Sequence, residues 1–216
     1  MSRNRTATAP SVRRVTQCVF GLVATLLLTG CIRADVDLRI DRAGRVNGTV
    51  IIAFSSGLLQ AVGQKRSDVI ADVREASKDV PKGMKVEVYD VGMYVGERIT
   101  FAGVPAEQFG QLVATAARGT GALGATTAQD FVLEKSSKRW RFFGTVDLTP
   151  AAMAAIPGVN GADLAALQKG TQIHIKITFP GIVTARDKSA KVSGKAISWN
   201  PKPGEHIQMQ AVAKLG

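Results

Sequence analysis

Hydrophobic and polar residues alternate along much of the chain beyond residue 31, and this period of two residues predicts β-strands. Between 172 and 179 the alternation is complete, with isoleucine or phenylalanine at every odd position. Turn residues separate several such segments into pairs, which is typical of β-hairpins. We therefore expect hairpins at 35–40 with 45–54, 84–89 with 94–101 and 131–134 with 139–148, followed by strands at 171–179, 195–199 and 207–213.

Two other segments, 67–77 and 105–117, place apolar side chains at the spacing of an amphipathic helix. Shorter helices are expected at 149–156 and 162–168, where prolines and glycines mark the boundaries. Hairpins with helices between them predict a single α+β domain. We expect a curved, partly barrel-like antiparallel sheet packed against two main helices and several short ones, enclosing a cavity.

The first thirty residues have the features of a secretory signal. Four arginines and no acidic residue precede an apolar run at 18–28, which is too short to span a bilayer. The sequence Leu28-Thr29-Gly30-Cys31 then resembles a bacterial lipobox, in which the Cys31 thiol takes a diacylglyceryl group and cleavage follows Gly30. A secretory signal without lipid and a buried apolar helix are the alternatives.

We therefore expect a lipoprotein signal peptide at 1–30 and an extracytoplasmic domain at 31–216. Acyl groups such as palmitate on Cys31 would hold this domain on the outer face of the cell membrane, because two or more chains attach stably where one does not. Cys18 leaves with the signal peptide and Cys31 is alkylated, so the mature chain has neither a disulfide nor a reactive thiol.

Composition restricts the chemistry further. The chain of 216 residues is 45% hydrophobic and 21% charged, which is typical of a globular protein. The formal charge is +11, of which the signal-peptide arginines supply +4, leaving +7 on the mature domain. The two histidines, His174 and His206, have no acidic cluster beside them, so no metal and no cofactor are expected.

Motifs of catalysis are also missing from the sequence. Neither a nucleophile elbow nor a Walker loop occurs, so we expect no enzymatic activity. Residues 119–124 match GxGxxG, but the match follows a predicted helix instead of a strand. We interpret it as a surface loop or a lid over the cavity, not as a dinucleotide site.

Several pieces of the mature chain, taken in order, resemble the LppM-type lipoproteins of actinobacteria. These pieces are the lipobox, the turn Asp41-x-x-Gly44, the segment 96–101 (GERITF), the segment 178–183 (TFPGIV) and the segment 193–199 (SGKAISW). The resemblance implies a membrane-anchored envelope domain with a curved sheet packed on helices, which binds lipid or lipoglycan and does not catalyse. Members often end in a transmembrane helix, whereas this sequence ends at Gly216, so Cys31 is the expected anchor.

We predict that the domain binds envelope lipid or an anionic glycolipid. Basic residues on one hairpin would meet the anionic headgroup, and apolar residues would line the cavity for acyl chains. Nucleic acid is excluded as a partner because the domain lies outside the cytoplasm. The alternatives are that these apolar residues form a filled core and that the protein is an interaction module without a lipid ligand. The predicted site residues are Lys138, Arg139, Arg141, Phe101, Phe109, Leu112, Phe142, Ile175 and Ile177.

Overall fold

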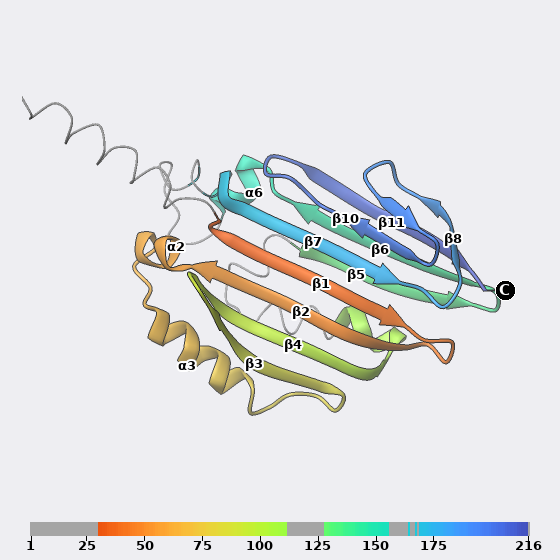
Figure 1. The fold of residues 1–216 in the computed structure, drawn as a ribbon, viewed down its shortest axis with the longest axis horizontal. Coiled ribbons are helices and arrows are strands. Elements are labelled where there is room, and N and C mark those ends of the chain that lie inside the picture. Colours follow the sequence, from red (N-terminus) through yellow and green to blue (C-terminus); the bar gives the residue numbers. More distant parts are fainter. Residues whose placement is uncertain (1–29, 112–127, 156–163, 165–166, 168, 216) are drawn as a thin grey trace, which may run out of the picture.

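The structure, a computed structural model, describes residues 30–111, 128–155, 164, 167 and 169–215 (Figure 1). The helices are α2 (Ser56–Ala61), α3 (Arg66–Ala76) and α6 (Pro150–Ala154), and residues 106–111 are also helical. The strands are β1 (Ile32–Ile40), β2 (Arg45–Ser55), β3 (Met84–Val91), β4 (Tyr94–Pro105), β5 (Ala128–Ser136), β6 (Arg139–Asp147), β7 (Thr171–Thr178), β8 (Ile182–Arg186), β9 (Lys191–Ser193), β10 (Ala196–Trp199) and β11 (His206–Lys214).

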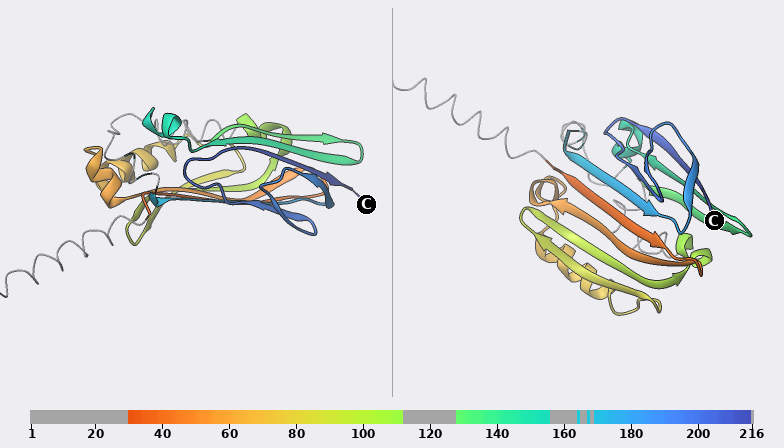
Figure 2. Two further views of the ribbon diagram at one scale, coloured as in Figure 1. Left: turned by 90° about the horizontal axis from the view of Figure 1, so that it is seen from above. Right: turned by 45° about the vertical axis from the view of Figure 1, so that its right-hand side comes forward.

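The strands form two sheets. The larger has the order β3-β4-β2-β1-β7-β10-β9 and the smaller has the order β5-β6-β11-β8. Neighbouring strands are antiparallel except for β1 and β7, which run parallel. Seen from above, the smaller sheet covers part of one face of the larger, and helices cover another part of that face (Figure 2). The α+β class is therefore confirmed.

The expectation of a partly barrel-like sheet is wrong, because the two sheets do not close on each other. The chain leaves the larger sheet after β7 at Pro180-Gly181 and enters the smaller sheet at β8. Proline has no N–H to continue the ladder of β7. The smaller sheet thereby keeps its own two edges, β5 and β8, and packs face to face on the larger one.

The expected hairpins are present. In the first, Asp41 and Gly44 make the turn, and the Asp41 carboxylate accepts a hydrogen bond from the Arg45 backbone N–H at 2.8 Å. Asn47-Gly48, a second pair of residues typical of turns, lies instead inside β2, where the register with β4 shifts. Gly48 has a φ of 138°, and a Cβ there would lie 2.1 Å from the Asp37 carbonyl oxygen, so a close strand approach explains this glycine.

The helix predictions are correct in part. The helix expected at 67–77 is α3, which begins at Arg66, with the Asp68 carboxylate accepting from the Lys65 N–H at 3.3 Å. The expected helix at 105–117 begins after Pro105, which still belongs to β4, and its residues beyond 111 lie outside those described. Most of the expected helix at 162–168 also lies outside the described residues. Short elements α2, β8 and β9 were not expected, because six residues or fewer carry too little periodicity.

Buried apolar side chains form two clusters. The larger lies between the sheets and includes both tryptophans, Trp140 and Trp199, which are fully buried. The Trp199 indole Nε1 donates to the Asp187 carboxylate at 2.8 Å, whereas the Trp140 Nε1 has no hydrogen-bond partner among the described residues. The smaller cluster lies where β1 begins, and it comprises Cys31, Ile32, Phe54, Leu58, Leu59, Val95, Met153 and Leu167.

Candidate functional site

The apolar residues predicted to line a cavity lie in the main core. Phe101, Phe109, Phe142, Ile175 and Ile177 are each no more than 2% exposed. The rings of Phe101 and Phe109 meet edge to face with centroids 5.7 Å apart. In this arrangement the five side chains fill the space between the sheets, which is the alternative that the sequence left open. Leu112 lies outside the described residues, and lipid binding by this set stays a prediction.

The basic residues predicted to meet a headgroup lie on another surface. Along β6, buried Trp140 and Phe142 alternate with exposed Arg139 and Arg141. The alternation points the arginines away from the core. Lys138 is exposed in the turn between β5 and β6. The structure therefore does not bring the predicted headgroup residues to the predicted acyl-chain residues.

A cleft of about 670 Å³ opens instead at the end of the molecule remote from Cys31. We call this the far end; it lies on the right of Figure 1, where β11 ends. The volume is in the range of small-molecule sites. Three cationic and several apolar side chains line the cleft together, since its lining consists of Arg42, Pro180, Gly181, Ile182, Thr184, Lys195, Lys214 and Leu215.

The cations of the cleft come from three separate turns or strand ends. Arg42 lies in the β1–β2 turn, Lys195 between β9 and β10, and Lys214 at the end of β11. All three are exposed, and none forms a salt bridge with any residue that the structure describes. Like charges that converge on a concave surface raise the local positive potential and attract anions.

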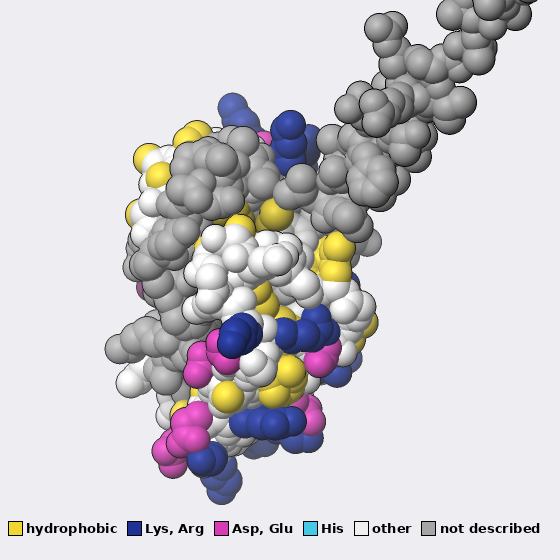
Figure 3. All heavy atoms as spheres, turned by 90° about the vertical axis from the view of Figure 1, so that its left-hand side faces the viewer, with side chains coloured by type: hydrophobic (Ala, Val, Ile, Leu, Met, Phe, Trp, Pro, Cys, Tyr) yellow, Lys and Arg dark blue, Asp and Glu magenta, His cyan; other side chains and the backbone are white. Residues whose placement is uncertain are grey.

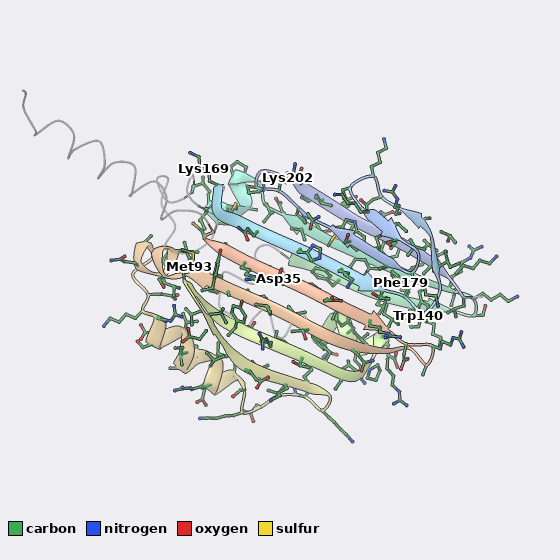
Figure 4. All side chains as sticks on the ribbon, in the orientation of Figure 1. Asp35, Met93, Trp140, Lys169, Phe179 and Lys202 are labelled. Atoms are coloured by element: carbon green, nitrogen blue, oxygen red, sulfur yellow. The ribbon has the colours of Figure 1, made fainter. Side chains whose placement is uncertain are left out.

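Backbone contacts fix the shape of the cleft. A Cβ on Gly181 would lie 2.0 Å from the Lys214 carbonyl oxygen, so only glycine fits there. The Phe179 N–H donates to the Lys195 carbonyl at 2.9 Å, and Figure 4 shows Phe179 at this end of the sheet. The Leu215 N–H donates to the Lys138 carbonyl at 2.9 Å, which ties the end of β11 to the basic β5–β6 turn. These backbone contacts hold together the strand ends and turns that surround the cleft.

Apolar surface in the cleft comes chiefly from β8 and the end of β11. Ile182 is 61% exposed, the highest value among the large hydrophobic residues of the described chain. Leu215 is half-buried beside it in the lining. An anion with an attached hydrocarbon group matches this combination of charge and apolar surface.

The two histidines do not meet. The His174 Nδ1 lies 2.6 Å from the Asn200 Oδ1 on the larger sheet, whereas His206 pairs with Asp147 at 3.3 Å on the smaller one. Hydrogen bonds from Thr149, with a smaller contribution from His206, lower the pKa of the Asp147 carboxyl. In the part of the chain that the structure describes, no three potential ligands gather as a metal site would require.

Asp35, Asp37 and Asp41 do not form a cation site either. Asp35 binds Arg33 at 2.6 Å and Asp37 binds Lys176 at 3.0 Å across β1 and β7. Asp41 is used in its own turn. The carboxylates of Asp35 and Asp37 on the outer face of β1 are therefore already paired with cationic side chains.

Glu97 is a buried acid that the sequence reasoning did not single out. Its side chain lies on the inner face of β4, is 2% exposed, and its Oε1 has no hydrogen-bond partner among the described residues. Burial raises the pKa of the Glu97 carboxyl to about 7. Its burial could have been predicted from the sequence, because the alternation of 94–101 places this glutamate on one face with Val95, Ile99 and Phe101.

Cys31 lies directly at the start of the folded domain. It is buried, its N–H donates to the Gly170 carbonyl at 2.7 Å, and its carbonyl accepts from the Ser55 N–H at 2.9 Å. β1 begins at the next residue, so no linker separates the expected acylation site from the sheet. The residues before Gly30 and the 119–124 loop lie outside the described parts, and no described helix is long and apolar enough to cross a bilayer.

Comparison with known proteins agrees with this architecture. The model of the LppM domain matches residues 33–215. A similar solved structure is the NMR structure of the folded domain of Mycobacterium tuberculosis LppM. It aligns with a TM-score of 0.59 and 18% sequence identity, over 87% of this chain and 91% of that one, which is a likeness of fold. No curated protein sequence matches the chain.

Proposed function

The chain belongs to the LppM domain family, and on that premise we propose that it is a lipid-anchored envelope protein whose far-end cleft binds an anionic amphiphile. Family membership indicates a lipoprotein-type protein of the cell envelope. The finer proposal is that Cys31 carries the acyl groups, on the extracytoplasmic face of the membrane. The protein acts by binding and not by catalysis, without a cofactor.

The observation that carries the binding proposal is the composition of the cleft. Arg42, Lys195 and Lys214 surround a surface to which Ile182 and Leu215 contribute apolar area. A phosphate or carboxylate would neutralise the converging cations, and a hydrocarbon chain would cover the exposed isoleucine. Anionic phospholipids and anionic glycolipids both have this chemistry.

The position of the cleft limits how the ligand arrives. β1 begins directly after Cys31 and ends at the far end, and its nine residues span about 30 Å. The cleft therefore lies well away from Cys31. A lipid must therefore leave the bilayer that holds the acyl chains, or project from another surface, to reach the cleft.

Titration with a short-chain lipid tests the proposal. The acylated protein in phosphatidylcholine nanodiscs would be titrated with dihexanoyl phosphatidylglycerol, with dihexanoyl phosphatidylcholine as the zwitterionic control. We expect saturable binding of the anionic lipid, and a loss of affinity of about fivefold per cation removed, because each base near an anionic headgroup contributes about 1 kcal/mol.

Matched variants locate the site. Lys195→Gln with Lys214→Gln removes two cations of the cleft, whereas Lys188→Gln with Lys191→Gln removes two exposed cations that do not line it. Equal affinity in the two double variants, or no preference for the anionic lipid, would contradict binding in this cleft.

An exposed apolar pair favours the second candidate, a protein-interaction module. Val132 on β5 and Phe143 on β6 are cross-strand partners on the outer face of the smaller sheet, 42% and 36% exposed. Such a pair suits a partner protein. Phe143→Ser would weaken pull-down of an envelope protein under this alternative and would leave lipid titration unchanged.

A further inference from the structure

The β3–β4 hairpin presents apolar side chains at the end of the molecule where Cys31 lies. Its turn, Gly92-Met93, follows Val91, and Val91 and Met93 are 53% and 38% exposed. Figure 4 labels Met93 at this end, near the start of β1 and on the same side of the molecule as Lys169. We call this the Cys31 end.

Backbone hydrogen bonds connect this turn to Cys31 through the end of β2. The Cys31 carbonyl accepts from the Ser55 N–H, and the next residue, Ser56, donates its N–H to the Met93 carbonyl, both at 2.9 Å. Tyr94, beside the turn, is also next to the chain at residue 30, since a Cβ on Gly30 would collide with the Tyr94 hydroxyl. The turn and Cys31 therefore belong to one continuous, hydrogen-bonded edge of the domain.

Arg66 satisfies the polar groups of the turn. Its guanidinium pairs with the Asp90 carboxylate and also donates to the carbonyls of Gly92 and Tyr94, each at 3.4 Å. It reaches the Ser56 hydroxyl as well, at 3.2 Å. Carbonyl groups that already accept hydrogen bonds are less costly to move out of water than open ones. The turn thus exposes apolar side chains while its backbone is largely satisfied.

Charges at this end are mixed in sign, unlike those of the far-end cleft. Figure 3, which views this end, shows hydrophobic side chains between basic and acidic ones. Arg66 is neutralised by Asp90, whereas Lys65 and Lys169 are exposed. This is the composition of a shallow contact with a lipid interface, in which apolar tips enter and lysines remain at the headgroups.

We propose that the Val91–Met93 turn lies in the surface of the bilayer that holds the acyl chains of Cys31, so that the domain stands on its Cys31 end and the cleft faces away. The inference rests on the acylation of Cys31 in the proposed function. A partner protein is the less favoured occupant of this surface. Cys31 is attached to the bilayer and β1 begins at the next residue, so the anchor already brings the turn close to the lipid.

Fluorescence quenching in vesicles tests this orientation. Acylation blocks Cys31 and cleavage removes Cys18, so Met93→Cys supplies a single reactive thiol for an environment-sensitive fluorophore. Ser137→Cys, in the exposed β5–β6 turn at the far end, is the matched control, and Val91→Cys is a second probe of the same surface. The acylated proteins would be reconstituted in phosphatidylcholine vesicles containing a lipid with a nitroxide on its acyl chain.

We expect quenching of the probe at residues 91 and 93 to exceed that at 137 by about threefold, because an interfacial contact buries apolar groups about 5–10 Å deep. Equal, weak quenching at all three positions in protein that floats with the vesicles would overturn the inference. Protein that does not float would instead show that the anchor has failed, so the two failures are distinguishable.

Discussion

The two ends of this domain differ in how their charges are used. At the Cys31 end, the Arg66 guanidinium pairs with Asp90 and donates to the carbonyls of a turn. The exposed surface of that turn then consists of the apolar side chains of Val91 and Met93. At the far end, Lys195 and Lys214 converge without a salt bridge to any described residue. A paired cation supports structure, whereas unpaired cations around a concave surface are available to a ligand.

Disrupting the corner that forms the far-end cleft should have the largest effect. Gly181→Ala would push a Cβ against the Lys214 carbonyl oxygen, so the β7–β8 corner and the end of β11 must separate. We expect a loss of about 3–4 kcal/mol in the free energy of unfolding by denaturant titration, and loss of lipid binding. Gly57→Ala is the control at the Cys31 end, because its nearest neighbour would be 4.0 Å away. Equal stability in both variants would show that the corner is not tightly packed.

Glu97, buried on the inner face of the larger sheet, differs from the charged groups at both ends because it should make the stability of the fold depend on pH. Burial raises the pKa of the Glu97 carboxyl in the folded state to about 7, above its ordinary value of 4.5, so between these pH values the folded state binds a proton that the unfolded chain does not. Stability is then greatest below pH 4.5 for this group and falls by about 3 kcal/mol as the pH rises to 7. Glu97→Gln should remove this fall, measured as the difference in unfolding free energy between pH 5 and pH 8. An unchanged pH dependence in the variant would contradict the burial of the carboxyl.

Reversing the charge of two cleft lysines should remove the converging positive charge that distinguishes the far end from the Cys31 end. Lys195→Glu with Lys214→Glu is expected to weaken binding of anionic short-chain lipid by about 100-fold, which corresponds to about 2.7 kcal/mol. The same reversal at Lys188 and Lys191, outside the lining, should change the affinity much less. A comparable loss in both would mean that overall charge, and not the cleft, determines binding.

Arg66→Ala should loosen the Cys31 end with a smaller effect. The side chain is one-third exposed, so its ion pair with Asp90 contributes little, and we expect a loss of about 1 kcal/mol or less in global stability. Local amide hydrogen exchange at Gly92 and Met93 should nevertheless rise, because two carbonyls lose their donor. Arg66→Lys is the second variant, because it keeps the positive charge but loses the several N–H donors of the guanidinium. If exchange is unchanged in both variants, Arg66 does not hold the turn.

Sequence reasoning succeeded where neighbours along the chain determine the structure. The alternation of 172–179 gave β7, and the Asp41–Gly44 turn gave the first hairpin. It failed on closure, because the sheet switch at Pro180-Gly181 is compatible with either a barrel or two sheets.

The candidate site could not be predicted for a related reason. Arg42, Lys195 and Lys214 are far apart in sequence and meet through the pairing of β1, β7 and β11 with their neighbours. The basic hairpin at Lys138–Arg141 was the stronger local signal, yet alternation along β6 directs its arginines away from Phe142. Local patterns located the elements, whereas the cleft depends on long-range packing.

The most direct test of the central claim is an amide chemical-shift titration of the acylated protein in nanodiscs with dihexanoyl phosphatidylglycerol. The account predicts saturable shifts concentrated at the cleft, at Gly181, Ile182, Lys195 and Leu215, with the Val91–Met93 turn unaffected. Shifts concentrated instead at core residues such as Phe101 and Phe142, or at the Cys31 end, would contradict it.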